Sequence, residues 1–184
     1  MTGTDKDGKV SGAEAPIRRA EPRDIPGIAR LLLEVQAIHA KGRPDLFEQG
    51  GRKYTDEEIA AITADEDTPV FVYESADGGL QGYVFCEIIR HGRSMNYVRE
   101  LYIDDLCVDA AARRKGIGRA LVQYAENYAA SVGIFRVTLN VWEINPEAGR
   151  FYESLGFRPL KTYLEKTIRR SEEIWTTDQK SKVK

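Results

Sequence analysis

The chain has 184 residues, of which 42% are hydrophobic and 30% are charged, and this composition suits a single domain with a substantial core. Its 27 basic and 29 acidic residues give a formal net charge of -2, so no overall basic field indicates a nucleic-acid partner. No apolar run approaches the ~18 residues of a membrane helix and no apolar signal segment opens the chain, so we expect a cytoplasmic protein without a membrane partner.

The amino-terminal part of the chain predicts a tail, a strand and a helix. Residues 1–15 are rich in Gly, Asp, Lys and Ser, which favours disorder. A short strand at 17–20 is followed by a helix with Asp24 as its N-cap and apolar residues at helical spacing up to Ile38. The polar stretch 39–55 then predicts a long loop, and long loops are often functional.

The remaining elements follow from periodicity and turn chemistry. Thr55 and Glu58 have the spacing of a capping box, which predicts a short helix over 55–63. We expect strands at 69–75, 80–90, 97–108, 135–142 and 157–168, and helices at 117–132 and 145–155. This order predicts an α/β fold with a mixed, mostly antiparallel sheet and helices on both faces. Cys86 and Cys107 lie in apolar runs and are expected to be reduced core residues.

The segment from Leu106 to Ala120 carries the clearest chemical signal. A strand ends, a basic turn with two glycines follows, and an amphipathic helix begins. The first N–H groups of a helix lack backbone partners and carry partial positive charge, so they bind anions. Gly116 and Gly118 let a phosphate approach the backbone, and the neighbouring arginines and lysine add positive charge. The pattern predicts a site for a pyrophosphate group, whereas a solvated basic turn is the simpler alternative.

These residues resemble a known family. Arg113-x-x-Gly116-x-Gly118 is similar to the (Q/R)xxGx(G/A) signature of the GNAT N-acetyltransferase superfamily. The preceding strand Asp105–Asp109 and the later Asn145-Pro146 with Phe151–Phe157 are similar to that family too. The resemblance implies a GNAT domain over 16–168, with a charged tail at 169–184, and a sheet that splays at a central bulged strand.

The resemblance also implies roles for individual residues. Acetyl-CoA is the expected co-substrate, with no metal, and Tyr152 takes the position of the usual general acid. The implied coenzyme-binding residues are Leu106, Cys107, Val108, Arg113, Arg114, Lys115, Gly116, Ile117, Gly118, Arg119, Ala120 and Asn145. On composition alone, Tyr152 fits a core aromatic residue and Asn145 a helix cap.

The general base and the acceptor site are less sharply indicated. An alkylamine is protonated at neutral pH, so a base or a water relay must remove a proton. The family resemblance favours Glu100, because several family members place a catalytic glutamate at the start of this strand. Asp104 and Asp105 are the alternatives, and strand alternation is expected to send them to opposite faces. Asp104 and Asp105, together with Arg43 and Phe47 from the long loop, are the candidate acceptor-binding residues.

The sequence thus predicts an acyltransferase that moves an acetyl group from acetyl-CoA to a primary amine. The sequence leaves open whether the acceptor is a small amine, a polyamine, an aminoglycoside-like compound or a protein amine. It also leaves open whether the enzyme prefers an acetyl or a longer acyl group, and whether it forms a homodimer. The alternatives are a non-catalytic domain that binds acyl-CoA as a regulatory ligand and a nucleotide-binding interaction module. No His, Cys and carboxylate set has the spacing of metal ligands, so we expect no metal.

Overall fold

The structure, a computed structural model, describes residues 16–92 and 98–168. It divides into two units, Met1–Gly149 and Arg150–Lys184, which are described separately. The predicted tails at 1–15 and 169–184 lie outside the described residues. None of the helices within the described ranges is long and apolar enough to cross a membrane.

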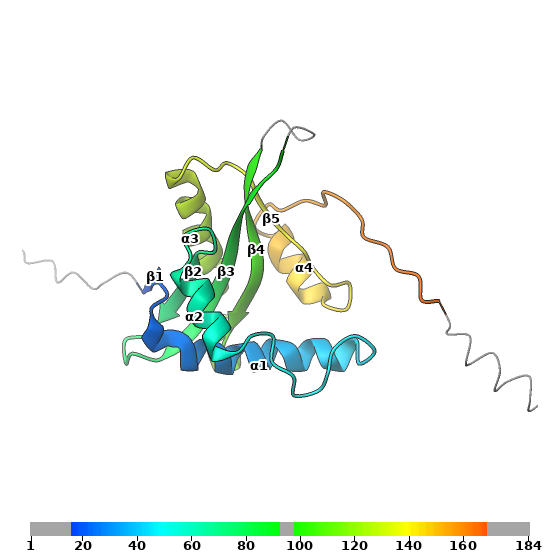
Figure 1. Cartoon of the computed structure of the whole chain (residues 1–184), viewed down its shortest axis with the longest axis horizontal. Coiled ribbons are helices and arrows are strands. Elements are labelled where there is room, and N and C mark those ends of the chain that lie inside the picture. The colour runs from blue at the N-terminus through cyan, green and yellow to red at the C-terminus, as the bar shows by residue number, and fades with distance from the viewer. Residues whose placement is uncertain (1–15, 93–97, 169–184) are drawn as a thin grey trace, which may run out of the picture. The chain divides into compact units, whose positions relative to one another are not determined.

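The first unit contains a five-stranded sheet with the predicted mixed character (Figure 1). Its strands are β1 (Ile17–Arg19), β2 (Val70–Glu74), β3 (Leu80–Arg90), β4 (Arg99–Val108) and β5 (Val137–Leu139), and they lie in this order across the sheet. The pairs from β1 to β4 are antiparallel, while β4 and β5 are parallel. A turn with Gly78 at a φ of 82° connects β2 to β3, as its ADGG sequence predicts.

Helices cover both faces of this sheet, as the order of elements predicts (Figure 1). These helices are α1 (Ile25–Gly42), α2 (Asp56–Ala64) and α3 (Ile117–Ser131), with short 3-10 turns η1 (Pro22–Asp24) and η3 (Ala110–Ala112). The last helix, α4 (Pro146–Glu153), crosses the boundary between the two units. Alternation along β2 explains the two faces: Val70 and Val72 join the core that contains α1 and α2, whereas Phe71 packs against Tyr124 and Tyr128 of α3.

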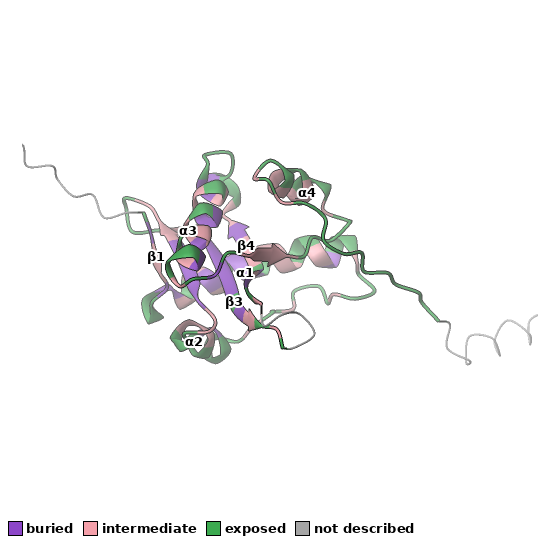
Figure 2. Cartoon of the chain, turned by 90° about the horizontal axis from the view of Figure 1, so that it is seen from above, coloured by how far each residue is buried: buried purple, intermediate pink, exposed green. Residues whose placement is uncertain are grey.

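The core fills the space between the sheet and the pair α1 and α2. Ile28, Leu31 and Ile59 from the helices are fully buried against Tyr83 and other sheet residues. Figure 2 shows the strands mostly buried and the outer surfaces of the helices exposed. Both cysteines are free and buried as predicted, and burial raises the pKa of each thiol to about 12.

Two predicted helix starts have different outcomes. Thr55 caps α2 through the predicted box, since its hydroxyl accepts from Glu58 N and the Glu58 carboxylate accepts from Thr55 N. Asp24 precedes α1 but makes no side-chain cap to it. Its carboxylate instead accepts two hydrogen bonds from Arg18, at 2.7 and 2.9 Å, and one from Glu21 N, because the chain enters α1 through a 3-10 turn.

Three predicted boundaries differ from the structure. The loop at 39–55 is shorter than expected because α1 continues to Gly42. The strand predicted at 135–142 is only Val137–Leu139, since β4 offers a partner to these three residues alone. Residues 157–168 form no strand. A strand needs a neighbouring ladder of hydrogen bonds, and the described part of the unit from Arg150 contains no other strand to supply one.

Candidate active site

A β-bulge interrupts β4 at the point where the candidate site lies. Phe85 of β3 pairs with Asp105, but the next residue, Cys86, pairs with Ile103, so Asp104 is an extra residue in β4. A bulge re-aims side chains because two residues on one strand oppose a single position on the other. The predicted separation of Asp104 and Asp105 to opposite faces is therefore wrong, since Lys53 Nζ lies 2.8 Å from one carboxylate and 3.8 Å from the other.

The bulge also marks the place where β4 and β5 separate. Their parallel pairing covers only Leu101 to Ile103 of β4. Leu106, Cys107 and Val108 remain paired with β3, but within the described ranges no strand pairs with their other edge. The strand therefore presents an unpaired backbone edge at three of the residues that the family resemblance implies to bind the coenzyme, and such an edge accepts an extended ligand as if it were another strand.

The amino end of α3 follows directly from this strand. α3 begins at Ile117 after Gly116, whose φ of 84° suits glycine, and Arg114 also has a positive φ of 64°. A Cβ on Gly116 would meet no atom within 4 Å, so the space in front of the helix is open. The first N–H of α3 that donates to a backbone carbonyl is that of Ala120, which lies 3.0 Å from Gly116 O. The N–H groups before it therefore point out of the helix end.

The predicted basic residues surround this helix end. Arg113, Arg114, Lys115 and Arg119 are exposed, while Ile117 is buried and anchors the helix to the sheet. Arg113 Nε donates to Val108 O at 3.1 Å, so this side chain folds back over the end of β4. The helix end lies close to the sheet at Gly82 of β3, where a Cβ would come within 2.9 Å of Cys107 O and 3.3 Å of Ile117 Cγ2. The donors, the open space and the positive charge fit the pyrophosphate of a coenzyme A.

An ion pair that the sequence analysis missed supports this turn. Arg30 of α1 lies 2.7 Å from Asp109 Oδ2, and Asp109 Oδ1 accepts a hydrogen bond from Ala111 N at 2.9 Å. These contacts lower the pKa of Asp109, with the hydrogen bond from Ala111 as the main cause. The pair joins α1 to the segment that leads from β4 into α3. No pattern in the sequence pointed to Arg30, because the contact depends on how α1 crosses the sheet.

The acidic pair lies in a small polar cluster beside the bulge. Asp104 accepts hydrogen bonds from Lys53 at 2.8 Å and from the Tyr54 hydroxyl at 3.1 Å, and Asp105 accepts one from the Tyr83 hydroxyl at 3.3 Å. The Asp104 side chain is 32% exposed, whereas that of Asp105 is 9% exposed. Burial raises the pKa of Asp105 above its usual range, and the positive charge of Lys53 opposes this shift only in part. Asp105 is therefore a carboxylate with an increased affinity for a proton.

Sequence reasoning found the two carboxylates of this cluster but not its other members. Lys53 and Tyr54 lie 51 and 50 residues before Asp104, at the end of the loop that precedes α2. The only available signal was that this loop is long. Tyr83 was assigned simply to a strand, and burial raises the pKa of its phenol well above the usual value, so the hydroxyl stays protonated.

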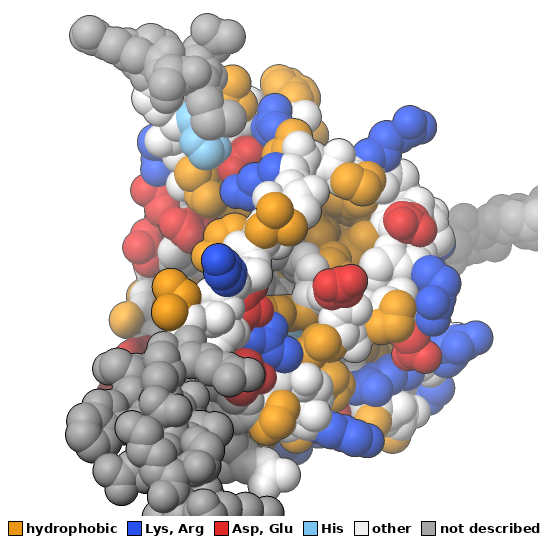
Figure 3. All heavy atoms as spheres, turned by 90° about the vertical axis from the view of Figure 1, so that its right-hand side faces the viewer, with side chains coloured by type: hydrophobic (Ala, Val, Ile, Leu, Met, Phe, Trp, Pro, Cys, Tyr) orange, Lys and Arg blue, Asp and Glu red, His pale blue; other side chains and the backbone are white. Residues whose placement is uncertain are grey.

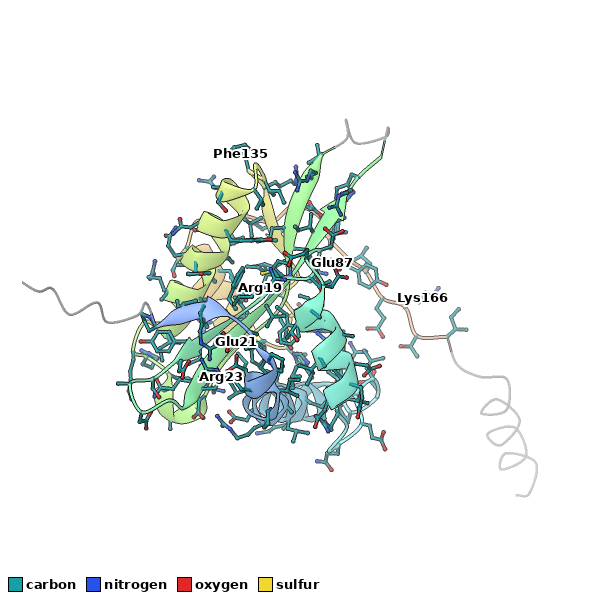
Figure 4. All side chains as sticks on the ribbon, turned by 60° about the vertical axis from the view of Figure 1, so that its left-hand side comes forward. Arg19, Glu21, Arg23, Glu87, Phe135 and Lys166 are labelled. Carbon is teal, nitrogen blue, oxygen red and sulfur yellow. The ribbon has the colours of Figure 1, made fainter. Side chains whose placement is uncertain are left out.

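Glu100 lies elsewhere on β4. It pairs with Ile89 of β3 and is five residues from Asp105, or about 16 Å along an extended strand. Its carboxylate lies 3.0 Å from His91 Nε2 and 3.2 Å from Arg136 Nε, although neither contact has hydrogen-bond geometry. Arg136 follows Phe135, which Figure 4 places at the opposite end of the sheet from Glu21 and Arg23. The structure thus does not bring Glu100 into the cluster around the bulge.

The acceptor candidates in the long loop take different positions. Phe47 contacts the rings of His39 and Trp142, with centroid distances of 5.0 and 5.3 Å. Arg43 forms two hydrogen bonds to Asp45, at 2.8 and 2.7 Å. Figure 3 shows basic, acidic and hydrophobic side chains interspersed over one face of the molecule instead of a single charged field.

Asn145 and Tyr152 belong to the region around α4. Asn145 Oδ1 accepts from Ala148 N at 3.1 Å, so Asn145 caps α4 as its sequence predicts. Tyr152 lies in the second unit, where its ring contacts Phe151 and Phe157 at 5.0 and 5.6 Å between centroids. The coenzyme contact of Asn145 and the general-acid role of Tyr152 both stay predictions.

Comparisons with known proteins concern the family and the fold of the chain. A sequence model of the acetyltransferase (GNAT) family matches residues 32–157. The chain is 28% identical over 148 residues to glucosamine 6-phosphate N-acetyltransferase 1 of Oryza sativa subsp. japonica, covering 80% of this chain and 86% of the relative. It is 32% identical to streptothricin acetyltransferase of Streptomyces lavendulae, covering 56% of this chain and 51% of that protein. A solved tetramutant of the BH1408 protein from Bacillus halodurans superimposes with a TM-score of 0.79 and 29% identity, covering 83% of this chain and 99% of that chain.

Proposed function

The chain belongs to the GNAT acetyltransferase family and is an acyltransferase, and we propose that it moves an acetyl group from acetyl-CoA to a primary amine. The observation that carries the proposal is the junction of β4 and α3. There an unpaired strand edge beyond the bulge leads directly to a helix end with exposed N–H groups and positive charge. This junction suits a ligand with an extended amide-containing arm and a pyrophosphate group.

The coenzyme-binding role falls to the residues that the sequence predicts. Acetyl-CoA supplies the acetyl group as a thioester, which an amine attacks readily. The N–H groups at the start of α3, with Arg113, Arg114, Lys115 and Arg119, would hold its phosphates. The backbone of Leu106, Cys107 and Val108 would hold the pantetheine arm, and Asn145 would add a polar contact.

Asp105 is the general base in this proposal. An acceptor amine with a pKa of ~10.4 arrives protonated at neutral pH and must lose a proton before it can attack. The Asp105 carboxylate lies at the bulge, is mostly buried, and has a raised pKa, all of which suit proton abstraction. Asp104 is more exposed and is placed to attract the cationic amine. Glu100, the base that the sequence favoured, is the alternative, and its distance from the bulge argues against it.

Tyr152 is the proposed proton donor to the leaving thiolate. A thiol pKa of ~8.5 makes the thiolate a moderate leaving group, and a phenol hydroxyl assists its departure by protonating it. The acceptor is proposed to be a small molecule, since the matched relatives act on glucosamine 6-phosphate and on streptothricin, according to their names.

The test combines turnover with binding. A panel of primary amines that includes glucosamine 6-phosphate, streptothricin and simple alkylamines is incubated with acetyl-CoA, and released thiol is detected. In parallel, acetyl-CoA at a hundredfold its dissociation constant is expected to stabilise the protein by about 2.7 kcal/mol, which a thermal melt measures. Stabilisation without turnover of any amine would instead support a regulatory acyl-CoA-binding domain. Equal stabilisation by a nucleotide that lacks the pantetheine arm would favour a nucleotide-binding module.

A further inference from the structure

Lys53 occupies an unusual place for a basic residue beside a site that receives amines. Its Nζ lies 2.8 Å from Asp104 Oδ2, 3.8 Å from Asp105 Oδ2 and 5.2 Å from the centre of the Tyr54 ring. Burial works to lower the pKa of Lys53, but the charges of Asp105 and Asp104 outweigh it, and the pKa is raised. With both carboxylates ionised, the cluster has two negative charges and one positive charge, so one further positive charge neutralises it.

A neutral aromatic surface lies near this cluster. His39, Phe47 and Trp142, here called the aromatic cluster, have ring centroids between 5.0 and 6.1 Å apart. Burial and the positive charge of Lys53 lower the pKa of His39, so its ring is uncharged at neutral pH and lies within electrostatic reach of Lys53. Trp142 is 41% exposed, and neighbouring Leu46 is 52% exposed. Rings and apolar groups pack well on such a surface.

We propose that Lys53 is a specificity-determining residue that restricts the acceptor to amines with a single positive charge, whose apolar or planar body rests on the aromatic cluster. The proposal rests on the proposed acetyl transfer to an amine and narrows its substrate class. One ammonium group is attracted by the acidic pair and balances the cluster. A second ammonium group that comes within about 5 Å of Lys53 meets a like charge, and such repulsion at a partly exposed site disfavours binding roughly tenfold.

The experiment compares pairs of amines in which the second member carries one additional ammonium group. Benzylamine and 1,4-bis(aminomethyl)benzene share a ring, and butylamine and 1,4-diaminobutane share a chain. The wild-type protein is expected to favour each monoamine in kcat/KM by at least tenfold. Lys53→Met removes the charge and should reduce this preference at least tenfold, through a higher kcat/KM for the diamine. Lys53→Arg keeps the charge and should preserve the preference.

The matched control is Arg52→Met. Arg52 is the neighbouring residue, is exposed, and forms an ion pair with Asp56 away from the acidic pair, so its loss should leave the preference unchanged. Trp142→Ala tests the aromatic cluster and should remove any advantage of benzylamine over butylamine. Thermal melts check that each variant is folded, and Lys53→Gln replaces Lys53→Met if the latter unfolds.

Calorimetric binding of the same four amines to the coenzyme A complex gives a readout that does not depend on turnover. Failure of the proposed acetyl transfer would appear as absent thiol release in the wild-type protein, while the dissociation constants still compare monoamine with diamine. The proposal is overturned if Lys53→Met lowers kcat/KM equally for the monoamine and the diamine. A wild-type preference for diamines in both kcat/KM and the dissociation constants overturns it too. Absence of binding by all four amines overturns it as well.

Discussion

Replacement of Asp105 by Asn tests whether the Asp105 carboxylate acts in catalysis or only stabilises the fold. The amide has nearly the same shape and keeps an oxygen that can accept a hydrogen bond from the Tyr83 hydroxyl. In the wild-type structure this hydroxyl lies 3.3 Å from Asp105 Oδ2. It cannot take a proton from the acceptor. We expect kcat/KM to fall by about 10²–10⁴-fold, the usual contribution of a general base, which corresponds to about 2.7–5.5 kcal/mol of transition-state stabilisation.

The same substitution is expected not to destabilise the fold. Burial raises the pKa of Asp105, so the folded protein at neutral pH carries a cost for keeping this group ionised. The cost is present above the raised pKa and disappears below the pKa of the unfolded chain. Each pKa unit corresponds to about 1.4 kcal/mol, and each kcal/mol to about 2–4 °C in Tm for a chain of this size. Asp105→Asn should therefore match or exceed the wild-type Tm at pH 7.5 and lose this advantage as the pH falls toward 4.

Glu100→Gln is the comparison that decides the base. The Glu100 side chain is 10% exposed and lies 3.2 Å from Arg136, so loss of its charge leaves a guanidinium without its partner. We expect a destabilisation of about 1–3 kcal/mol with kcat/KM reduced less than tenfold. Steady-state kinetics with thiol detection and thermal melts at pH 7.5 and pH 4.5 provide the data. A kcat/KM for Asp105→Asn within threefold of wild type would refute the assignment, as would a large loss in Glu100→Gln with an unchanged Tm.

Three further substitutions test the coenzyme site, the proton donor and the packing of α3. Gly118→Asp places a negative charge at the helix end and should weaken acetyl-CoA binding at least tenfold in calorimetry, with a Tm change below about 2 °C. If binding and stability fell together, Gly118 would instead be a residue needed for packing. Tyr152→Phe should lower kcat and kcat/KM together by roughly 10–10³-fold with acetyl-CoA affinity kept, and unchanged single-turnover rates would leave the donor unassigned. Gly82→Ala brings a Cβ within 2.9 Å of Cys107 O and should destabilise the protein by about 1–3 kcal/mol in urea titrations, whereas an unchanged midpoint would show that α3 moves away from the sheet easily.

Local sequence patterns were sufficient for the elements whose geometry depends on near neighbours. The capping box of Thr55 and Glu58, the cap of Asn145 and the helix end at Gly116 were all read from residues within three or four positions of one another. The coenzyme-binding junction also lies on one continuous segment, so its order along the chain already placed a strand end next to a helix start. Such features depend on short-range hydrogen bonds and on backbone preferences that each residue type carries with it.

The tertiary structure decided how the acceptor side of the site is built. Whether Asp104 and Asp105 share a face depends on the register between β3 and β4, which shifts by one residue at Phe85 and Cys86. Lys53 reaches them from 51 residues away, and Arg30 reaches Asp109 from α1. Contacts of this kind follow from strand register and helix packing, which the whole core determines together. A period-two pattern in the sequence predicts regular alternation and contains no signal for the extra residue that cancels it.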